Sequence, residues 1–415
     1  MFKIIAIVIL SVRFLFDFGL HVLEYKSRNR GIPEELSDVY DEATYLKWKR
    51  YAAEKLLVSM INDAVSFLFL LALLSSPLLS MAAMPIENPY TSAIVVLLVA
   101  LGGDILLSMP FDYVRDIKIE TKYGFNLSSV GTFLADQIKQ VVISMGLVMG
   151  LTCLLVLIHQ SLGDYTILLF SLILFGLVLA ISFFYPFFSK IYNKFASLEE
   201  GELRDALTKM LESHHYHVRD IKVMDASRRT TKSNAYFTGF GKSKTIVLYD
   251  NLLRSMSKEQ ILAVFAHEMG HGLHKDTLKS SLISLGQIVL IVVLAWLLLK
   301  FPEIYQDFGF SRVDYGFMIV LLLSVLLPLV VTLVGLAQHA MARKAEFRAD
   351  KQAVEEGYGD DLVSALKTLF REDLGDLNPH PLVVKLTYTH PTLLERVCHI
   401  KAYQKERPTQ AKASE

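Results

Sequence analysis

The sequence contains few cysteines and no excess of charge of either sign. Its 415 residues include two cysteines, and Cys153 lies within an apolar run, which argues against a disulfide framework of the kind found in secreted domains. Lys plus Arg and Asp plus Glu each total 42, so net charge gives no reason to expect a nucleic-acid partner. The N-terminal apolar run is interrupted by Arg13 and Asp17 and lacks a small-residue cleavage site. It is therefore expected to be a retained membrane helix and not a signal peptide.

Hydrophobic residues are what the chain has in excess. They make up 53% of the sequence, whereas soluble domains contain about 45–50%. A helix needs about 20 mostly apolar residues to cross a bilayer. Seven stretches meet this requirement, which predicts a mainly α, seven-helix integral membrane protein. The predicted spans are residues 4–23, 63–84, 92–111, 141–159, 165–187, 280–300 and 315–337.

The positions of these spans divide the chain into two parts. Residues 1–190 are expected to form a membrane domain of five helices with two basic loops. Residues 191–415 are expected to form a water-soluble domain, interrupted by a two-helix membrane hairpin at about 280–337. Residues from about 405 to 415 are expected to be a flexible tail.

Basic residues close to the membrane predict the orientation of the chain. Segment 25–58 holds seven Lys and Arg residues and segment 113–139 holds four, whereas segments 85–91 and 160–164 hold none. Loops rich in Lys and Arg remain in the cytoplasm. The N-terminus is therefore expected to be extracytoplasmic, and segment 190–279 and the C-terminus are expected to be cytoplasmic.

Several ionisable residues interrupt the predicted spans. Arg13, Asp17 and His21 follow one another at intervals of four residues, so they share one face of a helix. Asp104 lies in the middle of another span. Charges within a membrane helix usually face the interior of the bundle or a water-filled cavity. Two interpretations follow, namely pairing between helices and a hydrated internal cavity.

The segment "FAHEMGHGLHKD" (Phe265–Asp276) contains the pattern HExxH. On a helix this spacing places His267 and His271 one turn apart, where both imidazoles can bind one zinc ion. Glu268 then lies beside the metal, where it can take a proton from a bound water. Ser257 precedes the segment at a distance typical of an N-cap. The alternative is that the two histidines are hydrogen-bonded residues of an ordinary core.

A catalytic zinc usually has three protein ligands and a water, so a third ligand is expected elsewhere. Segment 338–357 continues the last predicted span and carries Glu346 and Asp350 four residues apart. One of these carboxylates could bind the metal while the other orients a ligating histidine. His339 is a rival ligand on a similar face. Because the hairpin at 280–337 separates these residues from the histidines, the metal is expected at the cytoplasmic membrane boundary.

The segment "SNAYFTGFGKSKTIVLYDNLL" (Ser233–Leu253) predicts two short strands joined by a glycine-containing turn. If Asn234, Ala235 and Tyr236 lie on an edge strand beside the metal helix, this strand can hold an extended peptide by main-chain hydrogen bonds. The alternative is a hairpin that only packs against the helix. The remaining histidines near the motif are expected at the surface, namely His214 to His217 and His274.

Five segments together resemble the CAAX prenyl protease 1 family of membrane zinc metalloproteases, over about residues 30–400. The resemblance implies a large hydrated chamber enclosed by seven helices and a gluzincin-like metallopeptidase domain with a small sheet. It also implies one Zn²⁺ per chain, bound by His267, His271 and Glu346. The similar segments are residues 32–51, 109–126, "HEMGH" (267–271), "ARKAEFRAD" (342–350) and "YTHPTLLER" (388–396).

The same resemblance gives expected roles to further residues. Asp350 would orient a ligating histidine, and His390 and Asn234 match residues close to the scissile peptide. His390 is the expected hydrogen-bond donor to the oxyanion, a role that improves the fit to the transition state. The alternative is that His390 caps a helix beginning near Thr392. The family often has a histidine where this chain has Asp276.

The resemblance implies an endopeptidase that uses a zinc-activated water with Glu268 as general base. Eukaryotic members remove the last three residues of CAAX proteins. The compact loops favour a bacterial member, for which quality control of membrane proteins is the expected role. The partners expected are a peptide or protein substrate, which can be membrane-associated, and the lipid bilayer. The expected location is the cell inner membrane, or the endoplasmic reticulum membrane if the protein is eukaryotic.

Three alternative classes fit the sequence less well. A site-2-type protease places HExxH within a membrane span, whereas charged residues, among them Lys258 and Lys275, bracket the motif in this chain. The shorter heat-shock proteases of the HtpX type are hard to reconcile with five N-terminal spans. A non-enzymatic transporter or scaffold with a structural zinc would be expected to have four ligands rich in cysteine.

Overall fold

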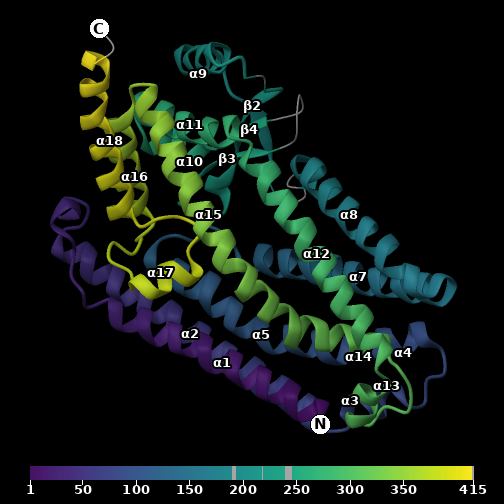
Figure 1. The fold of residues 1–415 in the computed structure, drawn as a ribbon. Helices are drawn as coiled ribbons and strands as arrows, with labels where there is room; N and C mark the ends of the chain where they lie inside the picture. The colour runs from purple at the N-terminus through teal and green to yellow at the C-terminus, as the bar shows by residue number, and fades with distance from the viewer. Residues whose placement is uncertain (189–192, 217, 239–244, 414–415) are drawn as a thin grey trace.

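The chain folds mainly into helices, with one small sheet near one end of the molecule (Figure 1). A computed structural model describes residues 1–188, 193–216, 218–238 and 245–413. The N-terminus lies at the end far from the sheet, and the C-terminus lies at the sheet end (Figure 1).

The N-terminal half consists of long helices that extend beyond the apolar stretches of the sequence. Two π-helical segments, Leu98–Gly102 and Val114–Ile119, connect three of the helices into one continuous rod from Pro89 to Tyr123. The helices are α1 (Phe2–Ser27), α2 (Glu42–Ser75), α3 (Leu78–Ala83), α4 (Pro89–Leu97), α5 (Gly103–Tyr113), α6 (Glu120–Tyr123), α7 (Val130–Leu162) and α8 (Thr166–Phe188).

The predicted span at 63–84 is wrong at its C-terminal end, because its helix ends at Ser75. Helix α2 begins at Glu42, where the Asp41 side chain accepts a hydrogen bond from the backbone of Thr44, and it ends at Ser75. Ser76 is extended, with φ −89° and ψ 165°, because it precedes Pro77. A proline disfavours helical backbone at the residue before it. The remainder of the predicted span forms the separate short helix α3.

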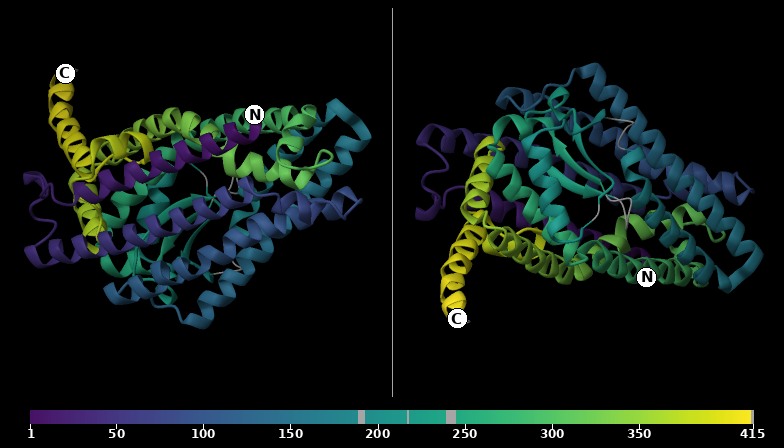
Figure 2. Two further views of the ribbon diagram at one scale, coloured as in Figure 1. Left: turned by 90° about the horizontal axis from the view of Figure 1, so that it is seen from below. Right: turned by 90° about the horizontal axis from the view of Figure 1, so that it is seen from above.

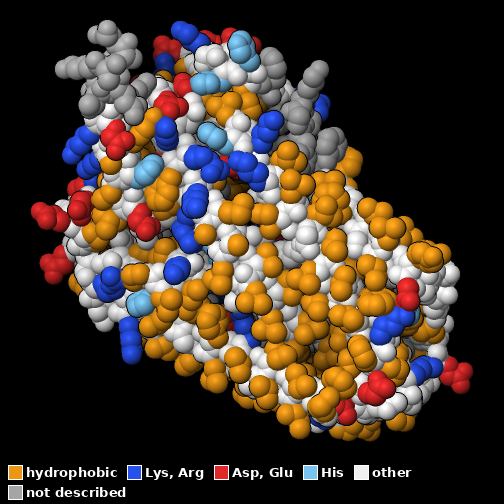
Figure 3. All heavy atoms as spheres, viewed as in Figure 1, with side chains coloured by type: hydrophobic (Ala, Val, Ile, Leu, Met, Phe, Trp, Pro, Cys, Tyr) orange, Lys and Arg blue, Asp and Glu red, His pale blue; other side chains and the backbone are white. Residues whose placement is uncertain are grey.

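Within the described residues, six helical stretches are long and apolar enough to cross a membrane. One of them, Val130–Ile181, contains both α7 and α8, which are separated by a turn at Gly163–Tyr165. The prediction of a seven-helix membrane protein is therefore confirmed. The surface over these helices is largely hydrophobic, whereas charged side chains gather near the sheet end (Figure 3). Such an extended apolar surface is typical of contact with lipid.

The ionisable residues of α1 form contacts with other helices, as the first interpretation expects, and they also line a cavity. Arg13 forms an ion pair with Asp17 and a hydrogen bond with Thr332. The imidazole Nε2 of His21 lies 3.1 Å from Oδ2 of Asp63 on α2. The contacts with Thr332 and Asp63 join α1 to other helices, and four of the five side chains, all but Thr332, also line a cavity of about 480 Å³.

The second half combines the sheet with a helical hairpin of membrane length. Helix α15 continues past the apolar region and brings its last turns back to the sheet end (Figure 1). A π-helical segment at Leu322–Leu326 joins α14 to α15. The elements are β1 (Phe195–Ser197), α9 (Glu202–Ser213), β2 (Asp220–Met224), β3 (Ala235–Thr238), β4 (Thr245–Tyr249), α10 (Asp250–Ser255), α11 (Lys258–Leu273), α12 (Asp276–Lys300), α13 (Pro302–Asp307), α14 (Tyr315–Leu321), α15 (Leu327–Glu355), α16 (Gly359–Glu372), α17 (Pro381–Thr387) and α18 (Leu393–Ala413).

The sheet has four strands in the order β1-β2-β4-β3. Strands β3 and β4 are antiparallel, with Ala235 opposite Leu248, which confirms the predicted pair of strands. Strand β3 is at an edge, as a peptide-holding strand requires. The parallel pairing of β2 with β4, in which Ile221 is opposite Ile246, was not predicted. Residues 239–244 of the predicted turn lie outside the described residues.

The two largest hydrophobic cores among the described residues lie at opposite ends of the molecule. Phe265 of α11, Leu248 of β4 and Trp48 of α2 belong to the core at the sheet end. Phe317 of α14 and Val156 of α7 belong to the core at the other end. Because α2 contributes to the first core, the N-terminal helices and the sheet end share buried apolar surface.

Helix α18 projects to one side beyond the rest of the molecule (Figure 2, right). Its backbone is helical from Leu393 to Ala413, so the helix continues into the segment from 405 that the sequence predicts as a tail. Thr392 accepts a hydrogen bond from the backbone of Glu395, and the Glu395 carboxylate accepts one from the backbone of Thr392. This reciprocal cap begins the helix.

Candidate metal centre

Helix α11 positions the HExxH motif. Ser257 caps its first turn, and its hydroxyl and the side chain of Gln260 form a reciprocal capping box. Phe265 and Met269 are buried and fix the rotation of the helix about its axis. This rotation turns His267 and His271 toward α15, with their ring centroids 4.9 Å apart.

A glycine within the motif lets α15 approach α11 closely. A Cβ atom added to Gly270 would lie 2.9 Å from Cα of Ala349 and 3.0 Å from Cβ of Gln352. Both distances are shorter than an ordinary contact, so no larger residue fits without movement of α15. Since Glu346 lies one turn before Ala349, this close contact brings its carboxylate to the two histidines.

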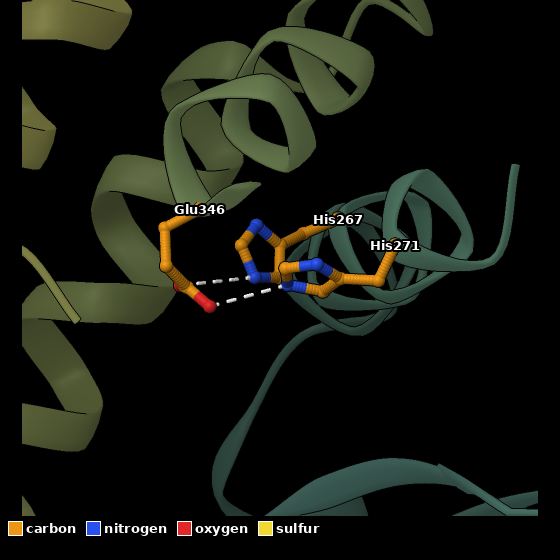
Figure 4. Close-up of side chains that lie close together, drawn as sticks. All are labelled: His267, His271 and Glu346. Atoms are coloured by element: carbon orange, nitrogen blue, oxygen red, sulfur yellow. Dashed lines mark ion pairs between the residues drawn. The ribbon is translucent and has the colours of Figure 1, made fainter. Parts of the chain in front are cut away.

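His267, His271 and Glu346 face one another (Figure 4). Their ligand atoms all lie within 4.8 Å of one another. Nε2 of His271 is 3.2 Å from Oε1 of Glu346, and Nε2 of His267 is 3.6 Å from Oε2. His267 and Glu346 are buried and His271 is half-buried. The motif in α11 and the carboxylate in α15 therefore form one compact cluster.

The chemistry of this cluster fits a metal ion. Oε2 of Glu346 is buried and has no hydrogen-bond partner among the described residues. A buried carboxylate oxygen without a partner is costly, and a bound cation would remove that cost. Two imidazoles with one carboxylate are a common ligand set of catalytic zinc.

Nδ1 of His267 contacts a buried carboxylate, that of Asp350, which is paired with Arg396. This Nδ1 lies 2.9 Å from Oδ1 of Asp350, which is fully buried on α15. Arg396 of α18 binds the same carboxylate at both oxygens, at 2.5 and 3.0 Å. A hydrogen bond from Nδ1 to a carboxylate fixes the tautomer that leaves Nε2 free to bind a metal. Asp350 therefore lies where the resemblance implies.

His271 has a corresponding partner in Asp276. Its Nδ1 lies 3.2 Å from Oδ2 of Asp276, whose other oxygen accepts a hydrogen bond of 2.8 Å from Arg348. Burial acts to raise the pKa of Asp276, but hydrogen bonding to His271 and the charge of Arg348 outweigh it and lower the pKa. The carboxylate is therefore charged and can accept a hydrogen bond from Nδ1–H of the imidazole.

Glu268 and His390 are the two expected catalytic side chains. Glu268 follows His267 on α11, and burial raises its pKa, an effect that the neighbouring histidines oppose. His390 follows α17, and its Nε2 lies 3.3 Å from Oε1 of Glu346. Its side chain is 64% exposed, which leaves it accessible to a substrate. Thr392, and not His390, caps α18.

The other candidate ligands lie outside this cluster. The Nδ1 atom of His339 is 2.8 Å from the carbonyl oxygen of Leu386, a contact that joins α15 to the end of α17. His274 contacts the carbonyl oxygen of Gly270 at 2.8 Å. His214 pairs with Glu356 at 2.5 Å. His217 lies outside the described residues.

Strand β3 packs against α11, next to the metal-binding helix. Asn234, which precedes the strand, is exposed, whereas Ala235 is 8% exposed and Tyr236 is half-buried. The carbonyl oxygen of Asn234 accepts a hydrogen bond from the backbone of Tyr249 on β4. Among the described strands, β3 is paired with β4 alone, so its outer edge is the candidate for pairing with a peptide.

Arg396, like Asp276, belongs to the site although the sequence alone assigned it no role. It is 8% exposed, it binds Asp350, and its Nη1 lies 3.6 Å from Oε2 of Glu346. Nearby acidic groups raise its pKa despite burial, so it carries a positive charge next to the ligands. Its place in "YTHPTLLER" was the available signal, but spacing alone does not show that it faces a residue 46 positions earlier.

Comparison with known proteins identifies both halves of the chain. Residues 197–404 match the model of peptidase family M48, and residues 21–191 match that of the CAAX prenyl protease N-terminal region with five membrane helices. The CAAX prenyl protease 1 homolog of Arabidopsis thaliana is 28% identical, over 90% of this chain and 91% of its own. The CAAX prenyl protease 1 of Saccharomyces cerevisiae is 29% identical, over 93% of this chain and 92% of its own. The crystal structure of S. mikatae Ste24p superposes with a TM-score of 0.88 at 26% identity, and covers 96% of this chain and 99% of that one.

Proposed function

Because this chain belongs to peptidase family M48 and is a membrane metalloprotease of the CAAX prenyl protease 1 type, we propose that the cluster on α11 and α15 is its catalytic zinc site. The observation that carries this proposal is the convergence of His267, His271 and Glu346 within 4.8 Å. These ligands come from helices that the α12–α14 hairpin separates in the sequence. The family match and the five-helix N-terminal region favour this activity over the site-2-type, HtpX-type and non-enzymatic alternatives.

His267, His271 and Glu346 would hold one Zn²⁺. When bound, zinc lowers the pKa of a water ligand to about 7 and polarises a substrate carbonyl. Asp350 and Asp276 accept hydrogen bonds from the Nδ1–H groups of the two histidines, so that both Nε2 atoms point toward Glu346. Arg396 neutralises part of the negative charge of Asp350 and Glu346, which keeps two buried carboxylates compatible with one site.

Glu268 acts as the general base. Its raised pKa lies closer to neutral pH than that of an exposed glutamate, which suits a group that first accepts and then returns a proton. It takes a proton from the attacking water and delivers it to the amine of the leaving peptide. Because the two ligating histidines flank it on α11, its position follows from the helix itself.

His390 donates a hydrogen bond to the oxygen that becomes negatively charged as the peptide carbonyl is attacked. Its exposed imidazole beside Glu346 supports this role, since a donor close to the reacting carbonyl stabilises the transition state. The free edge of β3 binds the substrate main chain, with Asn234, Ala235 and Tyr236 in contact with it. Main-chain pairing gives affinity with little sequence preference.

We further propose that the N-terminus is extracytoplasmic and that the sheet end and the C-terminus are cytoplasmic. The support is the alternation of basic and uncharged loops. In this orientation residues 1–190 form the membrane domain and residues 191–415 the peptidase domain, and a hydrated chamber lies between the helices. Reporter fusions at the two ends of the chain test the orientation. Two ends on the same side would contradict it.

The substrate is a peptide or protein at the membrane. The relatives named CAAX prenyl protease 1 make a C-terminal CAAX peptide the first candidate. For a bacterial chain, cleavage of damaged membrane proteins is the role we propose, in the inner membrane. For a eukaryotic chain the corresponding location is the endoplasmic reticulum membrane.

The test of the proposed function compares the wild type with Glu268→Gln. The variant keeps both imidazoles and Glu346 and loses the base, so it is expected to bind one zinc per chain and to cleave a fluorogenic CAAX-type peptide at least about 1,000-fold more slowly. Treatment of the wild type with 1,10-phenanthroline is expected to abolish cleavage, and added zinc to restore it. Near-normal turnover by Glu268→Gln would refute the mechanism.

A further inference from the structure

A basic pocket lies on the side of α17 that faces α15 and the start of α18. It has a volume of about 400 Å³. Arg30, Arg343 and Lys385 line it, and Glu395 is the acidic residue among the lining side chains. The carboxylate of Glu395 accepts hydrogen bonds from the backbone and the hydroxyl of Thr392, which cap α18. It offers one negative charge against three cations. The pocket therefore has an excess of positive charge.

The cations that line this pocket outnumber its carboxylates. Among the residues that the structure describes, no carboxylate forms an ion pair with Arg30, Arg343 or Lys385. Backbone carbonyl groups hold the two guanidinium groups instead. Arg30 donates to Pro379 at 2.8 Å, and Arg343 donates to Val384 at 3.2 Å and Tyr388 at 2.7 Å. A guanidinium has five donors in a fixed fork, so each of them retains donors for an anion.

The pocket lies where membrane helices reach the sheet end of the molecule. Arg30 follows the last residue of α1, Ser27, by three positions, and Arg343 follows the apolar part of α15. The hydrophobic surface gives way to charged side chains around α17 (Figures 1 and 3). Leu382 of α17 is 44% exposed and lies three positions before Lys385, on the same face of the helix. Basic side chains next to an exposed apolar one form an amphipathic surface.

From these observations we propose that the pocket binds the phosphate of an anionic phospholipid headgroup at the cytoplasmic face of the membrane. Arg30, Arg343 and Lys385 contact the phosphate oxygens, and an acyl chain lies along Leu382 and the exposed side of α1. Basic pockets between membrane helices at the cytoplasmic face bind lipid headgroups in this way. A bound lipid would hold α17, and with it His390, at a fixed depth relative to the bilayer.

Native mass spectrometry of the full-length, zinc-loaded protein tests this proposal, with phosphatidylglycerol and phosphatidylcholine added in equal amounts. The wild type is expected to retain phosphatidylglycerol preferentially. Each cation is worth about five-fold in affinity, so Lys385→Ala and Arg30→Gln are each expected to weaken retention about five-fold. Lys401→Ala removes an exposed lysine of α18 outside the pocket and is the matched control.

The two arginines also hold the backbone, so Lys385→Ala is the variant on which the conclusion depends. Equal retention of phosphatidylglycerol by Lys385→Ala and Lys401→Ala would overturn the proposal. Loss of the lipid from the wild type in about 10 mM inorganic phosphate would assign the pocket to free phosphate. A raised KM of Lys385→Ala for peptides with a free C-terminal carboxylate but not for amidated ones, with lipid retention unchanged, would assign the pocket to the substrate.

Discussion

Oδ2 of Asp276 lies 3.2 Å from Nδ1 of His271, and this contact joins the start of the membrane hairpin to the metal-binding helix. Asp276→Ala is expected to weaken zinc binding about 10- to 100-fold, because loss of a carboxylate that orients a ligating histidine costs about this much. Asp276→Asn can still accept the hydrogen bond but has no charge. Its zinc affinity is expected to lie between those of the wild type and Asp276→Ala. Competition with a zinc-binding dye measures the affinities independently of activity. Wild-type affinity in Asp276→Ala would show that His271 is held by other contacts.

Glu346 is expected to be the third ligand, and His339 is not. Glu346→Ala should lose zinc, since the cluster would keep two imidazoles and no carboxylate. His339→Ala should retain zinc, because its Nδ1 is occupied by the contact with Leu386 at 2.8 Å. Metal analysis of the two purified variants decides between them. Full zinc occupancy in Glu346→Ala would refute the assignment.

His390 and Asn234 are expected to affect different kinetic constants. His390→Ala should keep zinc and substrate affinity and lose about 100-fold or more in kcat, as loss of one oxyanion donor does in other hydrolases. Asn234→Ala should mainly raise KM, because it lies at the edge of β3 that we propose binds the peptide. Steady-state kinetics on a CAAX-type peptide separate the two effects. A kcat within a few-fold of wild type in His390→Ala would give this residue a structural role.

Gly270→Ala is expected to disrupt the site without touching a ligand. The new Cβ would lie 2.9 Å from the backbone of Ala349, which cannot rotate away, so α15 must shift and carry Glu346 with it. Overpacking of this kind costs about 1–3 kcal/mol, and we expect a lower Tm and weaker zinc binding. Gly286→Ala is the control, since nothing lies within 4 Å of a Cβ there and the same substitution favours helix. Equal effects of the two substitutions would contradict the close-packing argument.

Asp373 makes stability depend on pH. Burial raises its pKa to about 6 from 3.8, with Lys232 opposing, and its Oδ1 has no hydrogen-bond partner in the part of the chain that the structure describes. The folded protein therefore holds the proton more tightly than the unfolded chain does, and the stability from this group is present below about pH 4 and is lost as the pH rises through about 6. Asp373→Asn should raise Tm at pH 7.5 by roughly 2 °C, with no gain near pH 4. Exposed Glu212→Gln is the control, and a pH-independent effect of Asp373→Asn would show that the buried carboxylate does not titrate in this range.

The elements that the sequence predicted best are those fixed by local pattern. The HExxH spacing identified His267 and His271, and length and hydropathy identified the membrane helices. Glu346 was one of several open candidates until the family resemblance was considered, because a helix with acidic residues four apart is common on solvated surfaces. The approach of α11 to α15 at Gly270, which selects Glu346, depends on contacts between distant segments.

The elements that were missed also depend on distant contacts. Strand β2 pairs in parallel with β4, although β3 lies between them in the sequence. Nothing in the five residues of β2 requires this pairing. Arg396 gains its role only when α18 packs against α15. The end of α2 at Ser75 is a different case, since Pro77 marks it in the sequence, although the apolar run that continues past it favours a longer helix.

The order of the ligands along the chain has a consequence for biosynthesis. His267 and His271 leave the ribosome before α12 to α14, and Glu346 follows them on α15. If the zinc site is as proposed, a chain whose hairpin has not yet crossed the bilayer and returned has two of the three ligands and lacks the third. We then expect the newly made protease to be inert until its insertion is finished, so that other proteins are spared from an enzyme that is still being assembled.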